Sequence, residues 1–177
     1  MASSRDEILR TIRTRTVPTA PLPEPFSAGI RYEDPLKQFC EALAFVGGAS
    51  IIVRHLAAAD QELRKIPVLA NAKKVCSLVP GLGQSNVSLD SIDDPHLLED
   101  VDVAILPGKF GVAENGAIWL PTASLRQRVL PFITQHLVLV IPAAELVHNM
   151  HQAYESGFNS RERVSRVHFG AVQNRRH

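Results

Sequence analysis

The residues best suited to chemistry lie in a glycine-punctuated segment, residues 108–121. Its glycines, Gly111 among them, let the backbone approach a ligand closely, and Glu114 supplies a carboxylate. The Asn115-Gly116 pair that follows is typical of a hairpin turn. In open α/β sheets, ligands bind outside the carboxyl ends of the strands, and an apolar, strand-like run directly precedes this segment. The segment is therefore the best candidate site, and the alternative is an ordinary turn with a solvated Glu114.

Three other groups of residues are weaker candidates. The loop Gly81–Asn86 could hold a phosphate on its backbone N–H groups, but it lacks the third glycine of a dinucleotide fingerprint and the lysine of a P-loop, so a connecting loop is favoured. His148 and His151 share a helix face but need a third metal ligand, so a solvated face is favoured and no cofactor is expected. His136 directly precedes an apolar run that is expected to be a strand. It is either part of a ligand-binding site or a residue at the start of the strand whose ring hydrogen-bonds a backbone carbonyl.

Helices and strands alternate along the chain, which predicts an α/β fold with a mostly parallel sheet, helices on both faces and one hairpin. The expected helices cover residues 4–12, 35–46, 57–66 and 142–154, with one helical turn at 95–99. The expected strands cover residues 50–53, 74–79, 102–106, 116–120 and 137–141. Asp34-Pro35 should begin the second helix as its cap and first-turn proline, and Gly157 should end the last one.

A cluster of four prolines divides the chain. It lies within residues 17–25, where it excludes helix and sheet interior and predicts an extended linker. We therefore expect a helical arm and linker at 1–25 and one domain at 26–177. The arm's helix is amphipathic, so it is expected to dock on the body of the protein or on a partner.

Composition narrows the class of protein. The chain has 177 residues with 19 basic and 18 acidic side chains, which gives no support for nucleic acid or an anionic membrane as an obligatory partner. Cys40 and Cys76 lie in apolar runs, which favours two buried free thiols over a disulfide between them. Residues 1–16 lack the apolar core of a signal peptide, and every apolar run is shorter than the roughly 18 residues of a membrane helix, so we expect a cytoplasmic protein.

The run Gly111–Leu120 resembles the Ala-Glu-Thr-Gly-Thr segment of the LUD domain family, the family of lactate-utilisation protein C. Further features fit the same family: Arg128 shortly before a proline, His136 before an apolar strand and a proline, and a helix expected after Pro142. The sequence Ser-Arg-Asp-Glu-Ile-Leu in the arm also looks like that family.

The resemblance implies a three-layer α/β/α sandwich like that of the NagB/RpiA/CoA-transferase superfamily. It also implies a part in the oxidation of lactate to pyruvate, alongside iron–sulfur partner proteins. This chain has no Cys-x-x-Cys run and cannot hold such a cluster alone. Glu114 would be the acid/base or, by superfamily analogy, a nucleophile. The residues expected around a small anionic ligand are Gly111, Asn115, Gly116, Arg128 and His136.

The chain departs from the family pattern in two places. Asn115 and Ala117 stand where the family has threonine. Residues 166–177 also lack the Gly-Pro-Ser-x-Thr-Ala-Asp-Ile-Glu segment with which family members usually close, and which would offer amides and hydroxyls to an anion. Either the protein is a diverged member without the full pocket, or the sequence is shortened. Two functions therefore stay open: ligand binding in organic-acid utilisation, and a non-catalytic subunit that docks on a redox partner or self-associates.

Overall fold

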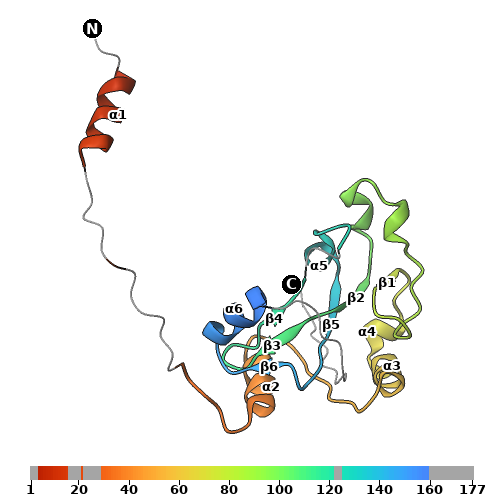
Figure 1. Cartoon of the computed structure of the whole chain (residues 1–177). Helices are drawn as coiled ribbons and strands as arrows, with labels where there is room; N and C mark the ends of the chain where they lie inside the picture. The colour runs from red at the N-terminus through yellow and green to blue at the C-terminus, as the bar shows by residue number, and fades with distance from the viewer. Residues whose placement is uncertain (1–3, 16–20, 22–28, 122–124, 160–177) are drawn as a thin grey trace.

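The computed structural model describes residues 4–15, 21, 29–121 and 125–159. The first helix, α1 (Ser4–Thr14), confirms the helix expected in the arm, and none of its residues is buried (Figure 1). Residues 17–25, expected to be a linker, lie outside the described residues except for Pro21.

The central feature of the body is a parallel sheet of three strands in the order β1-β2-β5. These strands are β1 (Val75–Ser77), β2 (Val103–Pro107) and β5 (His136–Val140), and they confirm three of the expected strands. The register aligns Val103 with His136 at one end and Pro107 with Val140 at the other. β2, and β5 after His136, are continuous apolar runs, as expected for strands buried on both faces.

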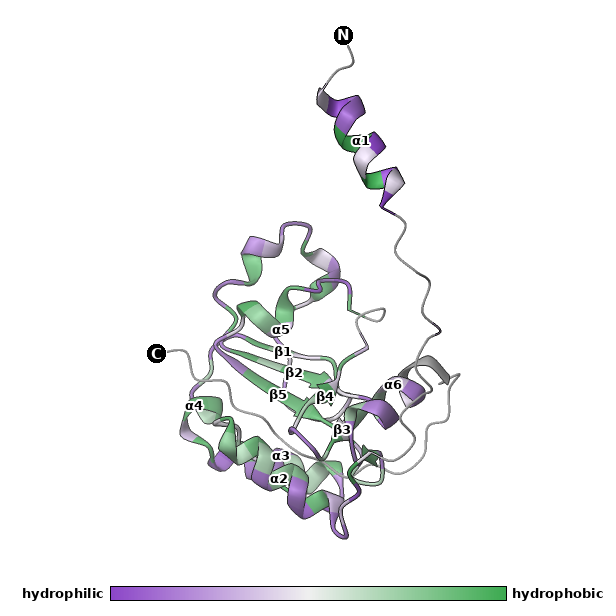
Figure 2. Ribbon diagram, turned by 90° about the vertical axis from the view of Figure 1, so that its left-hand side faces the viewer, coloured by the Kyte–Doolittle hydropathy of each residue, from purple (hydrophilic) through white to green (hydrophobic). Residues whose placement is uncertain are grey.

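Side chains alternate between the two faces of this sheet, and both faces are buried. Val103 and Ile105 of β2 pack with α3, while Ala104 and Leu106 pack on the opposite face with η2 and α5. Figure 2 shows α3 and α5 on opposite sides of this sheet. The elements on the first face are α3 (Leu56–Lys65) and α4 (Pro67–Ala70); those near the second are η1 (Leu89–Ser91), η2 (Pro95–Leu98) and α5 (Leu130–Ile133). This burial is what makes β2 the centre of the hydrophobic core.

A second, smaller sheet carries the glycine-rich segment. Its order is β4-β3-β6, with β3 (Phe110–Val112) antiparallel to β4 (Ile118–Trp119) and parallel to β6 (Leu146–Val147). The expected hairpin is confirmed. Strand β3 was not expected, because its glycine suggested a loop.

Helix α2 (Pro35–Phe45) packs against the second sheet through Phe39 and Leu43. Asp34 is its N-cap, with a carboxylate oxygen that accepts from the Lys37 backbone N–H at 3.0 Å. Gly47, just beyond the helix, has a φ of +83°, a conformation that favours glycine. The predicted start and end of this helix are therefore confirmed.

The helix expected over residues 142–154 is wrong in its first half. Leu146 and Val147 form β6 instead, because their backbone pairs with β3: the Ala113 N–H donates to the Val147 carbonyl at 2.9 Å. The helix α6 (Met150–Asn159) begins only after Asn149, whose side-chain oxygen accepts from the Gln152 N–H at 3.0 Å. Gly157 was expected to end this helix and instead lies within it.

The strand expected at residues 50–53 is also wrong, since only Val53 forms an isolated bridge. Ile52 is 56% exposed, so this run is too short and too open to sustain a ladder. The helix expected at 57–66 is confirmed as α3, and the turn at 95–99 as η2. Cys40 and Cys76 are both free, as expected, but only Cys76 is buried; Cys40 is half-buried.

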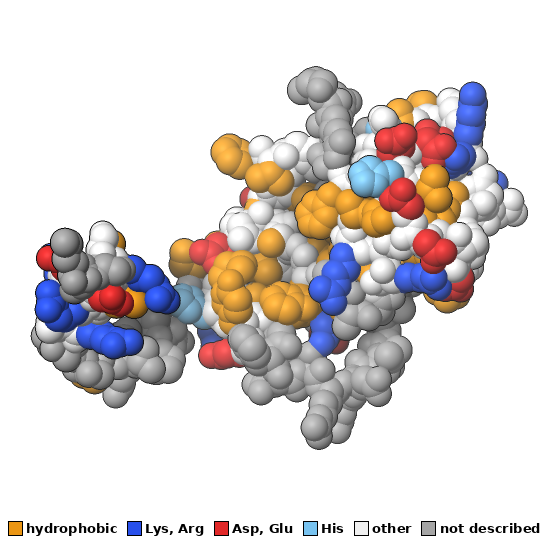
Figure 3. All heavy atoms as spheres, turned by 90° about the horizontal axis from the view of Figure 1, so that it is seen from above, with side chains coloured by type: hydrophobic (Ala, Val, Ile, Leu, Met, Phe, Trp, Pro, Cys, Tyr) orange, Lys and Arg blue, Asp and Glu red, His pale blue; other side chains and the backbone are white. Residues whose placement is uncertain are grey.

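The fold class is therefore α/β, with one parallel and one mixed sheet. Among the described residues, no helix is long and apolar enough to cross a membrane. The face in Figure 3 carries acidic and basic side chains interspersed, in keeping with a formal net charge of +1.

Candidate functional site

The turn between β3 and β4 is held by its own hydrogen bonds. The Val112 N–H donates to the Ala117 carbonyl at 2.8 Å, and the Gly116 N–H donates to the Val112 carbonyl at 2.9 Å. The Asn115 side-chain oxygen accepts from the Ala117 N–H at 3.0 Å, and Gly116 has a φ of +71°. Asn115 and Gly116 are thus the residues that this turn requires, and the Gly116 N–H is already used within it.

Two glycines allow the hairpin to pack closely on its neighbours. A Cβ at Gly116 would lie 2.9 Å from the Leu43 nitrogen, so only glycine lets the turn rest on the α2 backbone. A Cβ at Gly111 would lie 2.7 Å from Leu146 Cδ2 and 2.9 Å from Phe39 Cε2. Gly111 lies in the first strand of the hairpin and is buried, because Leu146 and Phe39 pack directly over it.

Glu114 is the exposed acid of this turn, and it lies at the N-terminus of α6. Its Oε2 accepts from the Met150 N–H at 3.0 Å, and its own N–H donates to the His148 carbonyl at 3.1 Å. A carboxylate here satisfies a free N–H of the helix and interacts favourably with the helix dipole. Among the described residues, Oε1 accepts no hydrogen bond, so one oxygen is left for chemistry.

The residues just before α6 tie the site to a distant segment. His148 Nδ1 accepts from the Tyr32 N–H at 3.0 Å, and the two rings stack with centroids 6.5 Å apart. Asn149, which is 3% exposed, donates from its side chain to the Ile30 carbonyl at 3.0 Å. Sequence reasoning missed both roles. The one available signal was Asn149 itself, because asparagine is a preferred N-cap residue whose side chain accepts from the N–H three residues later, here that of Gln152.

The two histidines near α6 do not form a metal centre in the described structure. His148 Nδ1 is already an acceptor for Tyr32, so the pair with His151 is not free to bind one ion. Within residues 4–15, 21, 29–121 and 125–159, no group of three or more His, Cys, Asp and Glu could hold a metal.

His136 lies at the opposite end of the sheet from Glu114. It is the first residue of β5 and pairs with Val103, the first residue of β2, whereas the hairpin follows Pro107 at the far end of β2. Five strand residues at roughly 3.3 Å each separate these ends. The structure therefore brings Gly111, Glu114, Asn115 and Gly116 together and does not bring His136 to them.

Arg128 is also apart from the hairpin. It is exposed in the turn before α5, the short helix that leads into the amino end of β5. No hydrogen bond or ion pair joins it to the hairpin among the described residues. Between α5 and β5, Thr134 Oγ1 and His136 Nδ1 are buried without a hydrogen-bond partner in the described part of the chain.

Asp102 organises this amino end of the sheet. Its Oδ2 accepts from the Lys73 N–H at 2.7 Å and the Lys74 N–H at 2.9 Å. The hydrogen bond from the Lys74 N–H is the largest cause that lowers the pKa of Asp102 below its ordinary value, and the bond from the Lys73 N–H adds to it. The charges of Lys73 and His136 lower this pKa further, while desolvation of the carboxylate opposes the shift.

The Gly81–Asn86 loop uses most of its polar groups in the fold. The Gly83 N–H donates to Asp60 Oδ1 at 3.2 Å, and Asn86 Oδ1 accepts from the Val75 N–H at 2.8 Å. Ser85 Oγ accepts from the Ser77 N–H at 3.2 Å, so Ser85 and Asn86 cover the outer edge of β1. The connecting-loop interpretation is therefore favoured over a phosphate cradle.

A first prediction concerns the pH dependence of stability. Because the pKa of Asp102 is lowered on folding, its ionised form stabilises the protein above about pH 4. That contribution is lost as the pH falls through the lowered pKa. We expect Asp102→Asn to lower the free energy of unfolding by about 1 kcal/mol at pH 7 and by much less at pH 2.5, measured by urea denaturation. Glu33→Gln, a change at an exposed acid, should have little effect at either pH, and a pH-independent loss in Asp102→Asn would contradict this account.

A second prediction concerns the cap on α6. Glu114→Ala removes the acceptor for the Met150 N–H and should destabilise the start of α6 by about 0.5–2 kcal/mol. We expect faster amide hydrogen exchange at Met150 in this variant, with little change in β2. Glu114→Gln keeps an oxygen acceptor and should show a smaller effect. Equal exchange in wild type and Glu114→Ala would exclude the capping role.

Comparison with known proteins gives one family match, and it covers this region. Residues 93–157, which include β2, the hairpin, β5, β6 and most of α6, match the family model of the LUD domain. A search of curated proteins found no match, and a search of solved structures also found none. The stretch that carries Glu114 and its contacts is therefore similar to the LUD domain family, as the resemblance of Gly111–Leu120 indicated.

Proposed function

We propose that this protein acts in the utilisation of lactate or a related organic acid, and that it binds a small anionic ligand near the Gly111–Pro121 turn. The family match supports the metabolic context, and the position of Glu114 supports the site. As part of the same proposal, residues 26–177 form one LUD-like domain, a three-layer α/β/α sandwich of the NagB/RpiA/CoA-transferase type. Residues 1–25 form its arm and linker, and the protein works in the cytoplasm.

The observation that carries this proposal is the contact between Glu114 and α6. The Met150 N–H, now bound to Glu114 Oε2, belongs to a helix N-terminus, which favours anions. A ligand carboxylate that takes over this N–H would release Glu114 and leave it beside the ligand. Glu114 would then accept or donate a proton as the acid/base.

The proton chemistry of Glu114 does not complete an oxidation. Conversion of lactate to pyruvate releases two protons and two electrons; the Glu114 carboxylate could accept one of the protons, the other would go to solvent, and neither electron would go to the carboxylate. The electrons need a separate acceptor, which iron–sulfur partner proteins would supply. Of the other expected ligand residues, Asn115 is beside Glu114 in the turn. His136 and Arg128 could take part only by contacting a partner or ligand at the other end of the sheet.

A third prediction tests the ligand site. Thermal melting of the full chain with lactate and pyruvate should show stabilisation by at least one of them. A ligand at about 100 times its dissociation constant stabilises a fold by roughly 2.7 kcal/mol, which is a shift of a few degrees for a domain of this size. Glu114→Gln should abolish the shift, while Glu155→Gln, a change at an exposed acid on α6, should retain it. Undiminished binding by Glu114→Gln would reject the assignment.

A second function, that of a non-catalytic subunit, is favoured by one observation. Ile8 and Ile12 form an apolar stripe on α1 and are 58% and 62% exposed. Exposed apolar stripes on helices are typical of surfaces that become buried on a partner. The partner would be a redox protein or a second copy of this chain.

A fourth prediction tests this subunit function through self-association. Ile8→Ser together with Ile12→Ser should lower the mass of the full chain in solution, measured by light scattering after gel filtration, without lowering the melting temperature of the body. Thr14→Ser, on the same helix, serves as the control. A wild-type chain that is monomeric at high concentration would rule out self-association through α1.

A further inference from the structure

The turn of the β3–β4 hairpin contains Asn115-Gly116, the one Asn-Gly pair of this sequence, and such a pair has a covalent chemistry of its own. The backbone nitrogen that follows an asparagine can attack the carbon of the side-chain amide and close a five-membered ring. A side chain on the following residue hinders this attack, and glycine has none. Asn71 and Asn86 each precede a residue with a Cβ atom, so they are less reactive by nature.

The closed hairpin leaves the asparagine reactive but occupies the attacking nitrogen. Asn115 is exposed, and among the described residues its Nδ2 donates no hydrogen bond, so the group that would leave as ammonia is accessible to water. Its Oδ1 accepts from the Ala117 N–H at 3.0 Å, which draws electrons from the amide carbon. Gly116, however, is buried, and its N–H donates to the Val112 carbonyl at 2.9 Å. The attack therefore requires the hairpin to open.

The hairpin is well suited to open locally. Strand β4 has two residues and lies at the edge of its sheet, where it pairs with β3 alone. The rings of Phe110 and Trp119 stack across this pair, with centroids 5.6 Å apart. A short edge strand opens at a much lower free energy than a buried sheet such as β2 with β5. We therefore expect transient opening of the turn while the core stays folded.

The main product of the reaction does not fit the closed turn. Isoaspartate routes the main chain through the former side chain and adds one carbon atom before Gly116. This glycine already rests on α2, since a Cβ on it would lie 2.9 Å from the Leu43 nitrogen and 3.0 Å from Leu43 Cα. Both of these are backbone atoms of a helix and cannot move aside. A longer main chain displaces Gly116 and breaks its hydrogen bond to Val112.

We propose that Asn115 is a site of spontaneous deamidation, that opening of the hairpin controls its rate, and that the isoaspartate formed prevents the hairpin from closing again. In the open hairpin the Gly116 nitrogen forms a bond to Asn115 Cγ. The bond from Cγ to Nδ2 breaks, and ammonia leaves with the proton of the Gly116 nitrogen. One water molecule then opens the succinimide ring at either carbonyl, which gives aspartate or isoaspartate without any oxidation or reduction.

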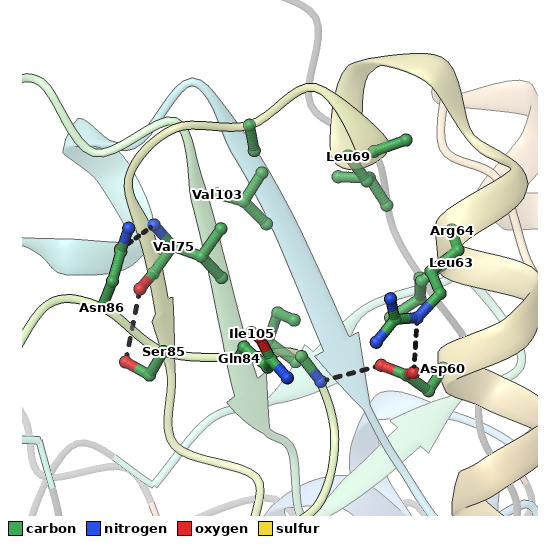
Figure 4. Close-up of a pocket in the computed structure, with 13 residues that line it drawn as sticks. Asp60, Leu63, Arg64, Leu69, Val75, Gln84, Ser85, Asn86, Val103 and Ile105 are labelled. Carbon is green, nitrogen blue, oxygen red and sulfur yellow. Dashed lines mark hydrogen bonds and ion pairs between the residues drawn. The ribbon is translucent and has the colours of Figure 1, made fainter.

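Peptide mapping by mass spectrometry, after incubation of the full chain in mildly alkaline buffer, tests the proposal. We expect the mass increase of amide-to-acid conversion at Asn115 well before it appears at Asn86, whose Oδ1 accepts from the Val75 N–H at 2.8 Å (Figure 4) and whose Nδ2 donates to the Lys73 carbonyl. Conversion of Asn115 should be several-fold faster in urea. A native chain that keeps Asn115 intact while the unfolded chain converts, or equal rates in both, would overturn the proposal.

Variants test the control by hairpin opening. Trp119→Ala removes the stacking on Phe110 and should speed conversion in the native chain but not in urea. Phe45→Ala, at a 92% exposed aromatic residue of α2, should leave the rate unchanged. Asn115→Ser removes the reacting amide, keeps an oxygen for the Ala117 N–H, and should show no mass change. An unchanged rate in Trp119→Ala would contradict control by opening.

Amide hydrogen exchange tests the effect of the product. The isoaspartate fraction, identified with an isoaspartate-specific methyltransferase, should exchange faster than wild type at Val112 and Gly116. Asn115→Asp carries the charge of the product without the extra main-chain atom and should exchange as slowly as wild type. Equally slow exchange in the isoaspartate fraction would show that the turn closes around the product and would reject this part of the proposal. None of these measurements uses a ligand, so their outcome is separate from that of the lactate and pyruvate experiment at Glu114.

Discussion

The parallel pairing of β2 with β5 is the constraint on which the rest of the structure depends. Its register aligns Val103 with His136 and Pro107 with Val140, and this fixes which residues lie at each end of the sheet. Because both faces are buried, the elements on each face must pack where the side chains of β2 point. The hairpin leaves the carboxyl end of β2 and packs against α2 and α6.

Local sequence predicted the elements whose signals are local. Asp34 and Pro35 predicted the start of α2, and the Asn115-Gly116 pair predicted the hairpin, because capping and turn geometry depend on neighbouring residues only. The segment 142–154 was misread for the opposite reason. Its apolar residues have helical spacing, but the backbone at Leu146 and Val147 pairs with β3, more than thirty residues earlier in the chain, and spacing contains no information about that partner.

The same distinction between local signals and contacts with distant segments applies to the candidate site. Sequence identified Glu114 and its turn, and the family match covers both. It did not show that Glu114 caps α6, because that role depends on the helix beginning at Met150 rather than at Pro142. It also grouped His136 with Glu114, since nearness to a family motif does not say at which end of a strand a residue lies. Only the register of β2 and β5 separates them.

The side chains of Ser85 and Asn86 have a consequence for how this molecule can meet its neighbours. An exposed edge strand presents unpaired N–H and carbonyl groups to which another chain can add a strand, and this is a common route to aggregation. On β1 the Val75 N–H is taken by Asn86 Oδ1, the Val75 carbonyl by the Asn86 N–H at 3.0 Å, and the Ser77 N–H by Ser85 Oγ. The loop that contains Ser85 and Asn86 therefore occupies the hydrogen-bonding groups that a further strand would use, so these groups are not available to another chain. Growth of the sheet across this edge is blocked, and contacts between copies must use side chains rather than a continuous β-ladder here.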